Sequence, residues 1–311
     1  PESESPNVCP MQECNNGKVL LIGNCEAGKT SMRSIIFANY KAKETRVLSP
    51  TYDVDQVQVQ FLGNLVLSIL DCGGQERFLN DIFTKKSKDV FSGVSIMLFV
   101  FNVASEQYET DWKIYQQAIE KIGMYSPNAL VYVLVHKMDK IPTDQKKAKI
   151  DFYTEKAKSL SNGKPIKVYG TSIWDETLYL AWSSVIQSLV PDSQRLQRQL
   201  NSLAEFTECD ELVLFERNTF LVLASSETSL PLDPYRFEKI SNTIKQFKIV
   251  TTRYRSSYEG FTIRDGNTII CMKPFTEFTS IMVISSTERT NEALISMNIQ
   301  CARQYFNDFH I

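Results

Sequence analysis

Hydrophobic and polar residues change their spacing once along this chain, and the change predicts two parts with different folds. Between residue 18 and about residue 190, short apolar runs alternate with stretches of helical spacing. This alternation predicts a mainly parallel sheet with helices on both faces. Gln56–Phe61 instead alternates strictly between polar and apolar residues, which predicts a half-exposed strand at the edge of that sheet.

Beyond Pro191, strand-like runs follow one another without helical crossovers, which predicts an antiparallel sheet. The expected elements are a helix over 193–206, strands over Glu211–Glu216 and Thr219–Ser225, a helix burying Phe237, Ile240, Ile244 and Phe247, strands near Gly260–Arg264, Thr268–Met272 and Thr279–Ile284, and a closing helix with Leu294, Met297, Cys301 and Tyr305 at helical spacing. The predicted fold class is therefore α/β followed by a smaller α+β part.

The length of 311 residues suggests about two domains. Residues 1–17 are polar and show no periodicity, so we expect them to be disordered. Residues 18–191 form the predicted first domain, and residues 192–311 form the second. Trp174 and Trp182 lie near the end of the first domain, where we expect both to pack in the core.

The segment Gly23–Thr30 lies between an apolar strand and a helical stretch, and its G-x-x-x-x-G-K-T spacing is that of a phosphate-binding P-loop. Glycines let backbone N–H groups turn toward phosphate oxygens, and the next helix adds the positive end of its dipole. Lys29 can reach the β- and γ-phosphates, and the Thr30 hydroxyl can ligate Mg²⁺. The predicted nucleotide contacts are Gly23, Glu26, Ala27, Gly28, Lys29, Thr30 and Ser31.

A second motif, Asp71–Gln75, follows the apolar strand Leu65–Leu70. In a D-x-x-G element, Asp71 is placed to hold Mg²⁺ through a water molecule, and the Gly74 N–H is placed to bind the γ-phosphate. Gln75 is placed to orient an attacking water. Gln75 and Lys29 are therefore predicted catalytic residues.

Two later strand ends carry side chains suited to a guanine base. His136-Lys137-Met138-Asp139 resembles the N-K-x-D element, with His in place of Asn. The Asp139 carboxylate can accept from the ring N–H and the exocyclic amine of guanine, a donor pair that adenine lacks, so GTP is favoured over ATP. The loop with Ser172 and Ile173 is expected to supply backbone N–H to the guanine oxygen. These motifs come in order at strand ends, where open α/β sheets bind ligands.

Long irregular strings around these motifs resemble the Rag GTPases, and the A/B-type subunit more closely than the C/D type. The strings are G-K-T-S-M-R-S-I-I-F (Gly28–Phe37), F-L-G-N (Phe61–Asn64), D-C-G-G-Q (Asp71–Gln75), H-K-M-D (His136–Asp139), T-S-I-W-D-E-T-L-Y (Thr171–Tyr179), L-F-E-R-x-T-F-L-V (Leu214–Val222) and R-F-E-K-I-S-N (Arg236–Asn242). The resemblance covers nearly the whole chain after residue 17.

The resemblance implies a GTP/GDP switch with Mg²⁺, in which Thr51 ligates the metal in the GTP state and takes part in catalysis. It implies a roadblock-type second domain and an obligate heterodimer with a C/D-type Rag subunit through residues 193–311. It further implies a scaffold complex that tethers the pair to the cytosolic face of lysosomes or vacuoles, and signalling of amino-acid sufficiency to the target-of-rapamycin complex. Hydrolysis is expected to be slow without a GTPase-activating protein in trans.

Two residues depart from the family pattern. Glu26 places a carboxylate in the P-loop, where small residues are usual, and Pro50 restricts the residue before it to extended conformations. Both bear on nucleotide affinity and on the hydrolysis rate. Arg46 and Arg77 are the arginines nearest the switch regions, and we expect surface roles for both.

Composition limits the kinds of partner that we expect for this chain. A formal charge of −2 gives no attraction to nucleic acid, and seven scattered cysteines with only two histidines indicate free thiols in a reducing compartment. The longest apolar run, Val94–Phe101, is too short to span a bilayer, and no lipidation motif is present. We therefore expect a cytoplasmic protein with no membrane anchor of its own.

Three alternatives remain open from the sequence. A trafficking GTPase of the Arf or Rab kind shares the motifs but would lack the second domain. An interaction scaffold could bind GTP without turning it over. A metabolic P-loop kinase is disfavoured by His136–Asp139, and selectivity for GTP over ATP would decide the matter.

Overall fold

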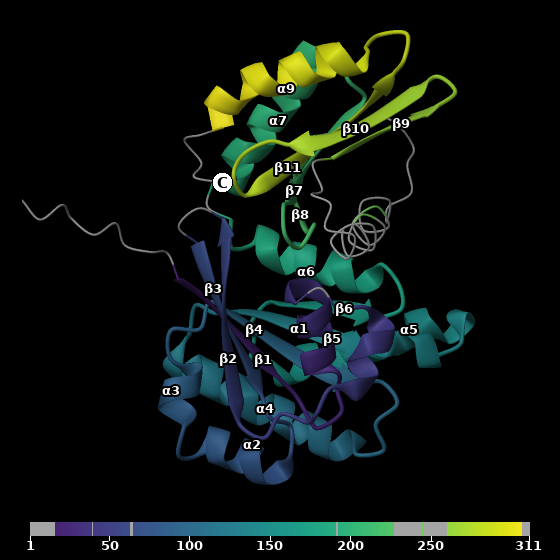
Figure 1. Cartoon of the computed structure of the whole chain (residues 1–311). Coiled ribbons are helices and arrows are strands. Elements are labelled where there is room, and N and C mark those ends of the chain that lie inside the picture. Colours follow the sequence, from purple (N-terminus) through teal and green to yellow (C-terminus); the bar gives the residue numbers. More distant parts are fainter. Residues whose placement is uncertain are drawn as a thin grey trace, which may run out of the picture.

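The computed structural model describes residues 16–38, 40–62, 65–190, 192–226, 240, 244 and 260–306. Over these ranges the chain forms two sheets with their own helices, joined by helix α6, which lies between them (Figure 1). The first sheet is mostly parallel and the second is antiparallel, which confirms the predicted fold class.

The first sheet has the strand order β2-β3-β1-β4-β5-β6. Its strands are β1 (Asn16–Ile22), β2 (Val54–Leu62), β3 (Leu65–Cys72), β4 (Ile96–Asn102), β5 (Leu130–His136) and β6 (Ile166–Thr171). Every neighbouring pair is parallel except β2 and β3. Among the described strands, β2 pairs with β3 alone and lies at the edge of the sheet, as its alternating pattern predicted.

Helices cover both faces of this sheet (Figure 1). The buried residues divide into two clusters, one with α1 (Lys29–Phe37) and α6 (Thr177–Gln187), and the other with α2 (Glu76–Phe83), α3 (Ser87–Phe91), α4 (Tyr108–Tyr125) and α5 (Thr143–Leu160). Two short 3₁₀ helices, η1 (Ala42–Val47) and η2 (Met138–Lys140), complete this part. The carboxyl ends of the parallel strands therefore lead into loops at one end of the sheet, between the two helical layers.

The second sheet has the order β8-β7-β11-β10-β9. Its strands are β7 (Glu211–Glu216), β8 (Val222–Ser225), β9 (Phe261–Asp265), β10 (Thr268–Pro274) and β11 (Thr279–Ser286). Helices α7 (Ser193–Thr207) and α9 (Glu292–Phe306) lie side by side on its outer face (Figure 1). Ile240 and Ile244 pack against the opposite face. Most of the predicted helix around them, including Phe237 and Phe247, lies outside the described residues, as do Pro191 and residues 1–15.

Two predictions for the second part were wrong in detail. Strand β8 begins at Val222 rather than Thr219, because the Thr219 hydroxyl and N–H both donate to Glu216 Oε2 at 2.6 Å and close a turn. The predicted apolar side of α9 is its exposed side: Met297 and Tyr305 are 56% and 65% exposed. The buried residues are instead Ile295, Ile299, Ala302 and Phe306. Apolar residues occupy two sides of this helix, so spacing alone did not distinguish them.

One apolar core joins the two sheets through α6. Trp182 is fully buried in a cluster that contains residues of β1, β4, β7 and β11. The Val222 N–H donates to Ser183 Oγ at 3.1 Å, and Gln187 Nε2 donates to the Val222 carbonyl at 3.1 Å. Helix α6 therefore packs on both sheets rather than serving as a linker.

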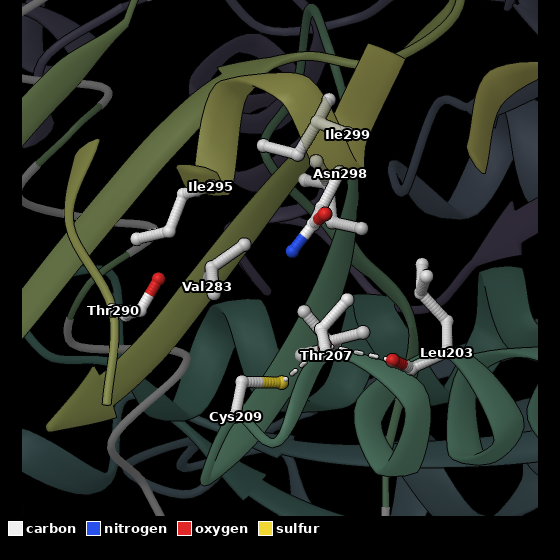
Figure 2. A pocket seen from close by; sticks show the side chains of 10 residues that line it. Leu203, Thr207, Cys209, Val283, Thr290, Ile295, Asn298 and Ile299 are labelled. Atoms are coloured by element: carbon white, nitrogen blue, oxygen red, sulfur yellow. Dashed lines mark hydrogen bonds between the residues drawn. The ribbon is translucent and has the colours of Figure 1, made fainter. Parts of the chain in front are cut away.

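A small cavity of about 20 Å³ lies between α7, α9 and the second sheet (Figure 2). Thr207 and Cys209 line it, and the Thr207 hydroxyl lies 2.7 Å from the Leu203 carbonyl and 3.3 Å from Cys209 Sγ. Its size is that of one water molecule.

Cys209 is one of five described cysteines, all of which are free thiols as predicted. Among the described helices, none has the length and apolar character needed to cross a bilayer.

Candidate nucleotide-binding site

The strand ends of the first sheet surround a pocket of about 290 Å³. The residues that line it come from the P-loop, the segment before β2 and the loop after β3: Cys25, Glu26, Ala27, Gly28, Lys29, Thr30, Ser31, Thr45, Leu48, Ser49, Pro50, Thr51, Cys72 and Gly74. Most of the phosphate and metal contacts predicted from the sequence therefore lie around one pocket. Gly23, Asp71 and Gln75 adjoin it without lining it.

The P-loop requires glycine at position 28. Gly28 has φ +94°, and a Cβ atom there would lie 2.7 Å from the His136 ring. The next residue, Lys29, is buried, and its Nζ donates to the carbonyls of Gly23 at 2.8 Å and Asn24 at 2.9 Å. Burial lowers the pKa of Lys29, and the nearby Asp71 opposes that shift. The loop therefore holds the ammonium group in place among its own carbonyl groups.

Asn24, which the sequence analysis did not single out, ties the P-loop to α4. Its Nδ2 donates to Asp111 Oδ1 at 2.7 Å and to Gln107 Oε1 at 3.1 Å, while its Oδ1 accepts from the Cys25 N–H at 2.8 Å. Asp111 is buried. Nothing in the spacing of these residues along the chain indicated the contact, because α4 begins more than 80 residues after the P-loop.

The predicted magnesium ligands lie together. The hydroxyl oxygens of Thr30 and Thr51 are 2.9 Å apart, although 21 positions separate the residues. Asp71 is fully buried, and its Oδ1 has no hydrogen-bond partner. Two hydroxyls and an orphaned carboxylate oxygen are hard oxygen donors of the kind that Mg²⁺ prefers. The residues present therefore fit Mg²⁺ held by Thr30 and Thr51, with Asp71 acting through water.

Arg33 holds the other oxygen of Asp71. Its Nε lies 3.2 Å from Asp71 Oδ2, and its Nη2 lies 2.7 Å from Asp55 Oδ2. Burial raises the pKa of Asp71, while Thr30, Lys29 and Arg33 act in the opposite direction. The sequence analysis did not assign Arg33 a role. Its position one helical turn after Lys29 is compatible with the Asp71 contact, but nothing in that position indicated the contact with Asp55.

The loop after β3 passes very close to the P-loop. A Cβ atom on Gly74 would lie 2.4 Å from the Cys25 backbone nitrogen, so only glycine fits there. The Gly73 N–H donates to the Asp53 carbonyl at 2.7 Å, which joins this loop to the segment after Thr51. Gln75 follows as the N-cap residue of α2, with a half-buried side chain. Its water-orienting role stays a prediction.

A second group of predicted residues lies at the ends of β5 and β6. Ser172 Oγ donates to Asp139 Oδ1 at 2.7 Å and accepts from the Trp174 N–H at 3.1 Å. The Ser172 N–H itself donates to Thr177 Oγ1 at 3.0 Å. These bonds hold the Asp139 carboxylate next to the loop that contains Ile173. Asp139, Ser172 and Ile173 do not line the pocket at the P-loop.

His136 connects the two groups. Its Nδ1 lies 2.9 Å from Thr171 Oγ1, and its ring packs against Gly28. Burial, followed by the charge of Lys137, lowers the pKa of His136 to about 4, so the ring is neutral near pH 7. With 1% of its surface exposed, His136 supports the site from behind. Its predicted contact with the nucleotide stays a prediction; in this structure the ring lies against Gly28 and does not line the pocket.

Glu26 has φ +57° and lines the pocket. Its carboxylate partly opposes the burial that lowers the pKa of Lys137, so the two side chains lie near one another.

Trp182 is buried as predicted, but Trp174 is 45% exposed, so its predicted core position was wrong. The Arg46 guanidinium lies 5.7 Å from the Trp174 ring, in a cation–π contact that accounts for its position.

Similarity to known proteins agrees with this geometry. The family model described as Gtr1/RagA G protein conserved region matches residues 18–244. Ras-related GTP-binding protein A of Dictyostelium discoideum is 41% identical over 292 residues, which cover 94% of this chain and 97% of that protein. GTP-binding protein gtr1 of Schizosaccharomyces pombe is 41% identical, covering 93% of this chain and 94% of that protein.

Ras-related GTP-binding protein C of Homo sapiens is more distant, at 22% identity over 94% of this chain and 76% of that protein. A parallel sheet with a P-loop, a D-x-x-G loop and a base-reading strand end defines the class of GTPase G proteins. Within that class, the chain belongs to the Gtr1/RagA family. The predicted resemblance to the A/B type rather than the C/D type is thereby confirmed.

Proposed function

We propose that this GTPase is the A/B-type subunit of a Rag heterodimer, a switch that binds GTP or GDP with Mg²⁺ and hydrolyses GTP slowly on its own. The observation that carries the proposal is the meeting of Thr30, Thr51 and Asp71 beside Lys29, with one Asp71 oxygen buried and unpartnered. A buried polar oxygen without a partner is commonly satisfied by a water or an ion, which supports the role proposed for Asp71 in holding Mg²⁺ through water.

In this mechanism the chain positions groups rather than reacting covalently. Mg²⁺, when bound, would neutralise charge on the β- and γ-phosphate oxygens. Lys29 would release the Gly23 and Asn24 carbonyls to contact the phosphates, and the Gly74 N–H would bind the γ-phosphate. Gln75 would orient the attacking water, and Asp139 would read the guanine. A GTPase-activating protein would supply further charge in trans.

The C/D-type partner is proposed to pair with residues 193–311. Strand β9 supports this proposal because it is an edge strand among the described strands of the second sheet, and Ile263 on it is 51% exposed. An open edge strand offers backbone groups to a second chain. Ile240 and Ile244, which belong to the predicted helix, pack against the same sheet. A heterodimer with no free subunits should bury roughly 2,000 Å² or more.

Tethering to a lysosomal or vacuolar scaffold and signalling to the target-of-rapamycin complex complete the proposal. A second exposed apolar surface supports a further partner: Phe206 of α7 and Met297 and Tyr305 of α9 line a groove of about 540 Å³ on the outer face. Monomeric proteins rarely leave such a patch uncovered. The protein would then be cytoplasmic and reach the membrane through this contact.

Single-turnover hydrolysis by the full chain tests the chemistry. We expect GTP to be hydrolysed and ATP to be left intact, with acceleration by an activating protein. Glu26 in the pocket favours one other candidate, a scaffold that binds GTP without turnover. Tight GTP binding with no hydrolysis, with or without the activating protein, would establish that alternative.

Co-expression of the full chain with a C/D-type subunit tests the pairing. Ile263→Glu should abolish co-elution in size-exclusion chromatography, whichever nucleotide is bound. Leu294→Glu, on the outer side of α9, is the matched control and should leave the pair intact. A pair that forms only with GTP, or that tolerates Ile263→Glu, would show that the interface lies elsewhere.

A further inference from the structure

Arg33 occupies a position between two carboxylates from different strands. Asp55 on β2 and Asp71 on β3 are directly paired across the antiparallel ladder, so their side chains lie on the same side of the sheet. Like charges directly opposite one another destabilise a sheet. The Arg33 guanidinium lies 2.7 Å from Asp55 Oδ2 and 3.2 Å from Asp71 Oδ2, and it neutralises this repulsion.

The two oxygens of Asp71 have different surroundings. Oδ2 accepts from Arg33, whereas Oδ1 is buried and has no partner. The contact with Arg33 therefore fixes the rotation of the carboxylate and reserves Oδ1 for the metal site beside Thr30. The Arg33 side chain is itself 15% exposed, so this bond is shielded from water on most sides.

The same guanidinium also reaches the segment that carries Thr51. Asp55 is the second residue of β2, which starts at Val54, three positions after Thr51. The Gly73 N–H further joins this segment to the loop after Asp71 through the Asp53 carbonyl. The place of Thr51 relative to Asp71 therefore depends on whether Arg33 holds both strands.

We propose that Arg33 is a positioning residue of the magnesium site, which orients Asp71 and couples it through Asp55 to the strand that follows Thr51. The inference rests on the Mg²⁺ role proposed above. Partners in the outer shell of a metal site commonly change metal affinity by about 10- to 100-fold when they are removed. A salt bridge that only stabilised the fold would change the melting temperature and leave Mg²⁺ affinity unchanged.

The test measures release of fluorescently labelled GDP from the full chain as Mg²⁺ is titrated. For wild type, Mg²⁺ should slow release with a defined midpoint concentration. Arg33→Met should raise that midpoint by about 10-fold or more. Arg33→Lys, which keeps the charge and folds more readily, should give a smaller rise because one ammonium cannot fork between two carboxylates.

Two further variants separate the parts of the proposal. Asp55→Asn keeps the Arg33–Asp71 contact and should raise the midpoint by a smaller factor than Arg33→Met. Lys85→Met removes an equal charge from the exposed Lys85–Asp81 pair, and its midpoint should equal that of wild type. The melting temperature is recorded for every variant.

An unchanged midpoint in Arg33→Met and Arg33→Lys, with a lowered melting temperature, would overturn the proposal and leave a structural salt bridge. A wild-type midpoint in Asp55→Asn alone would overturn the coupling to β2. If Mg²⁺ has no effect on wild type, the Mg²⁺ role itself fails, which is a different result from a failure specific to Arg33.

Discussion

The two sheets of this chain differ in how they can be used. In the first, parallel strands bring the ends of β1, β3, β5 and β6 to one edge, which carries Lys29 and Asp71 at the P-loop pocket and Asp139 beside Ser172. In the second, antiparallel neighbours alternate in direction, so successive loops lie at opposite edges. Its described part contains apolar surfaces, a cavity of about 20 Å³ and a more open pocket of about 660 Å³ whose lining includes Arg217, Lys273 and Glu292.

This comparison indicates that nucleotide binding and association with a partner require different arrangements of side chains. Phosphate and metal contacts need several polar groups at fixed distances, which parallel strand ends supply. Association needs exposed apolar surface and a strand edge, and the described part of the second sheet offers both, at Phe206, Tyr305 and β9. Substitutions in the first sheet's loops should therefore change nucleotide behaviour, and substitutions in the second should change stability or pairing.

The largest effect is expected at the base-reading end. Asp139→Asn should abolish the preference for guanine, because a site built to pair ligand donors rejects analogues that lack them by about 10⁴-fold or more. Competition of GTP and XTP for the full chain provides the measurement. A variant that still prefers GTP over XTP would remove Asp139 from the base site.

A core substitution in the second sheet should lower stability without changing nucleotide affinity. Phe215 is fully buried, so Phe215→Ala should cost about 3–5 kcal/mol of unfolding free energy. Phe206 is 82% exposed, and Phe206→Ala should change that free energy by less than about 0.5 kcal/mol. Urea titration gives both values. Loss of GDP binding by folded Phe215→Ala would break the separation between the two sheets.

Gln75→Leu should slow hydrolysis stimulated by an activating protein while GTP binding stays intact. Removal of one group that is aligned for the transition state commonly lowers the rate by about 10²–10³-fold. Stopped-flow phosphate release, with GTP affinity measured in parallel, provides the comparison. A wild-type stimulated rate would assign the water-orienting role to a residue supplied in trans.

A fall in pH should lower the free energy of unfolding through the protonation of His136. The folded-state pKa is about 4 against an ordinary 6.5, so the unfolded chain binds the extra proton and stability falls as the pH drops from 6.5 to 4. The shift corresponds to about 3 kcal/mol at full extent. His136→Asn should remove this part of the pH dependence, as measured by urea titration at several pH values. Parallel pH profiles for wild type and variant would contradict it.

The motif residues were predictable from the sequence because their chemistry fixes them in short strings. Lys29, Thr30 and Asp71 could each be assigned from the residues around them, and the strands before them were equally clear. Arg33, Asn24 and Asp111 were missed because their partners lie far away in the chain, at distances of 22 to 87 positions. Such contacts depend on how strands pair and helices pack, which local spacing does not encode.

Helix α9 shows a different limit. Its sequence has apolar residues on two sides, so both Met297 and Ile299 were compatible with a buried position, and only the packing against the second sheet selected Ile295 and Ile299. The buried side of a helix is predictable when one side alone is apolar. A helix with two apolar sides indicates two contacts, of which the described chain makes one.

Helix α6 has a consequence for how the molecule unfolds. Because one apolar cluster runs from β1 and β4 through α6 to β7 and β11, neither sheet keeps its buried surface if the other is lost. Separation of the two sheets at α6 would therefore expose apolar surface that is buried in the intact chain. We therefore expect heat or denaturant to destabilise both sheets together, because they share this apolar cluster.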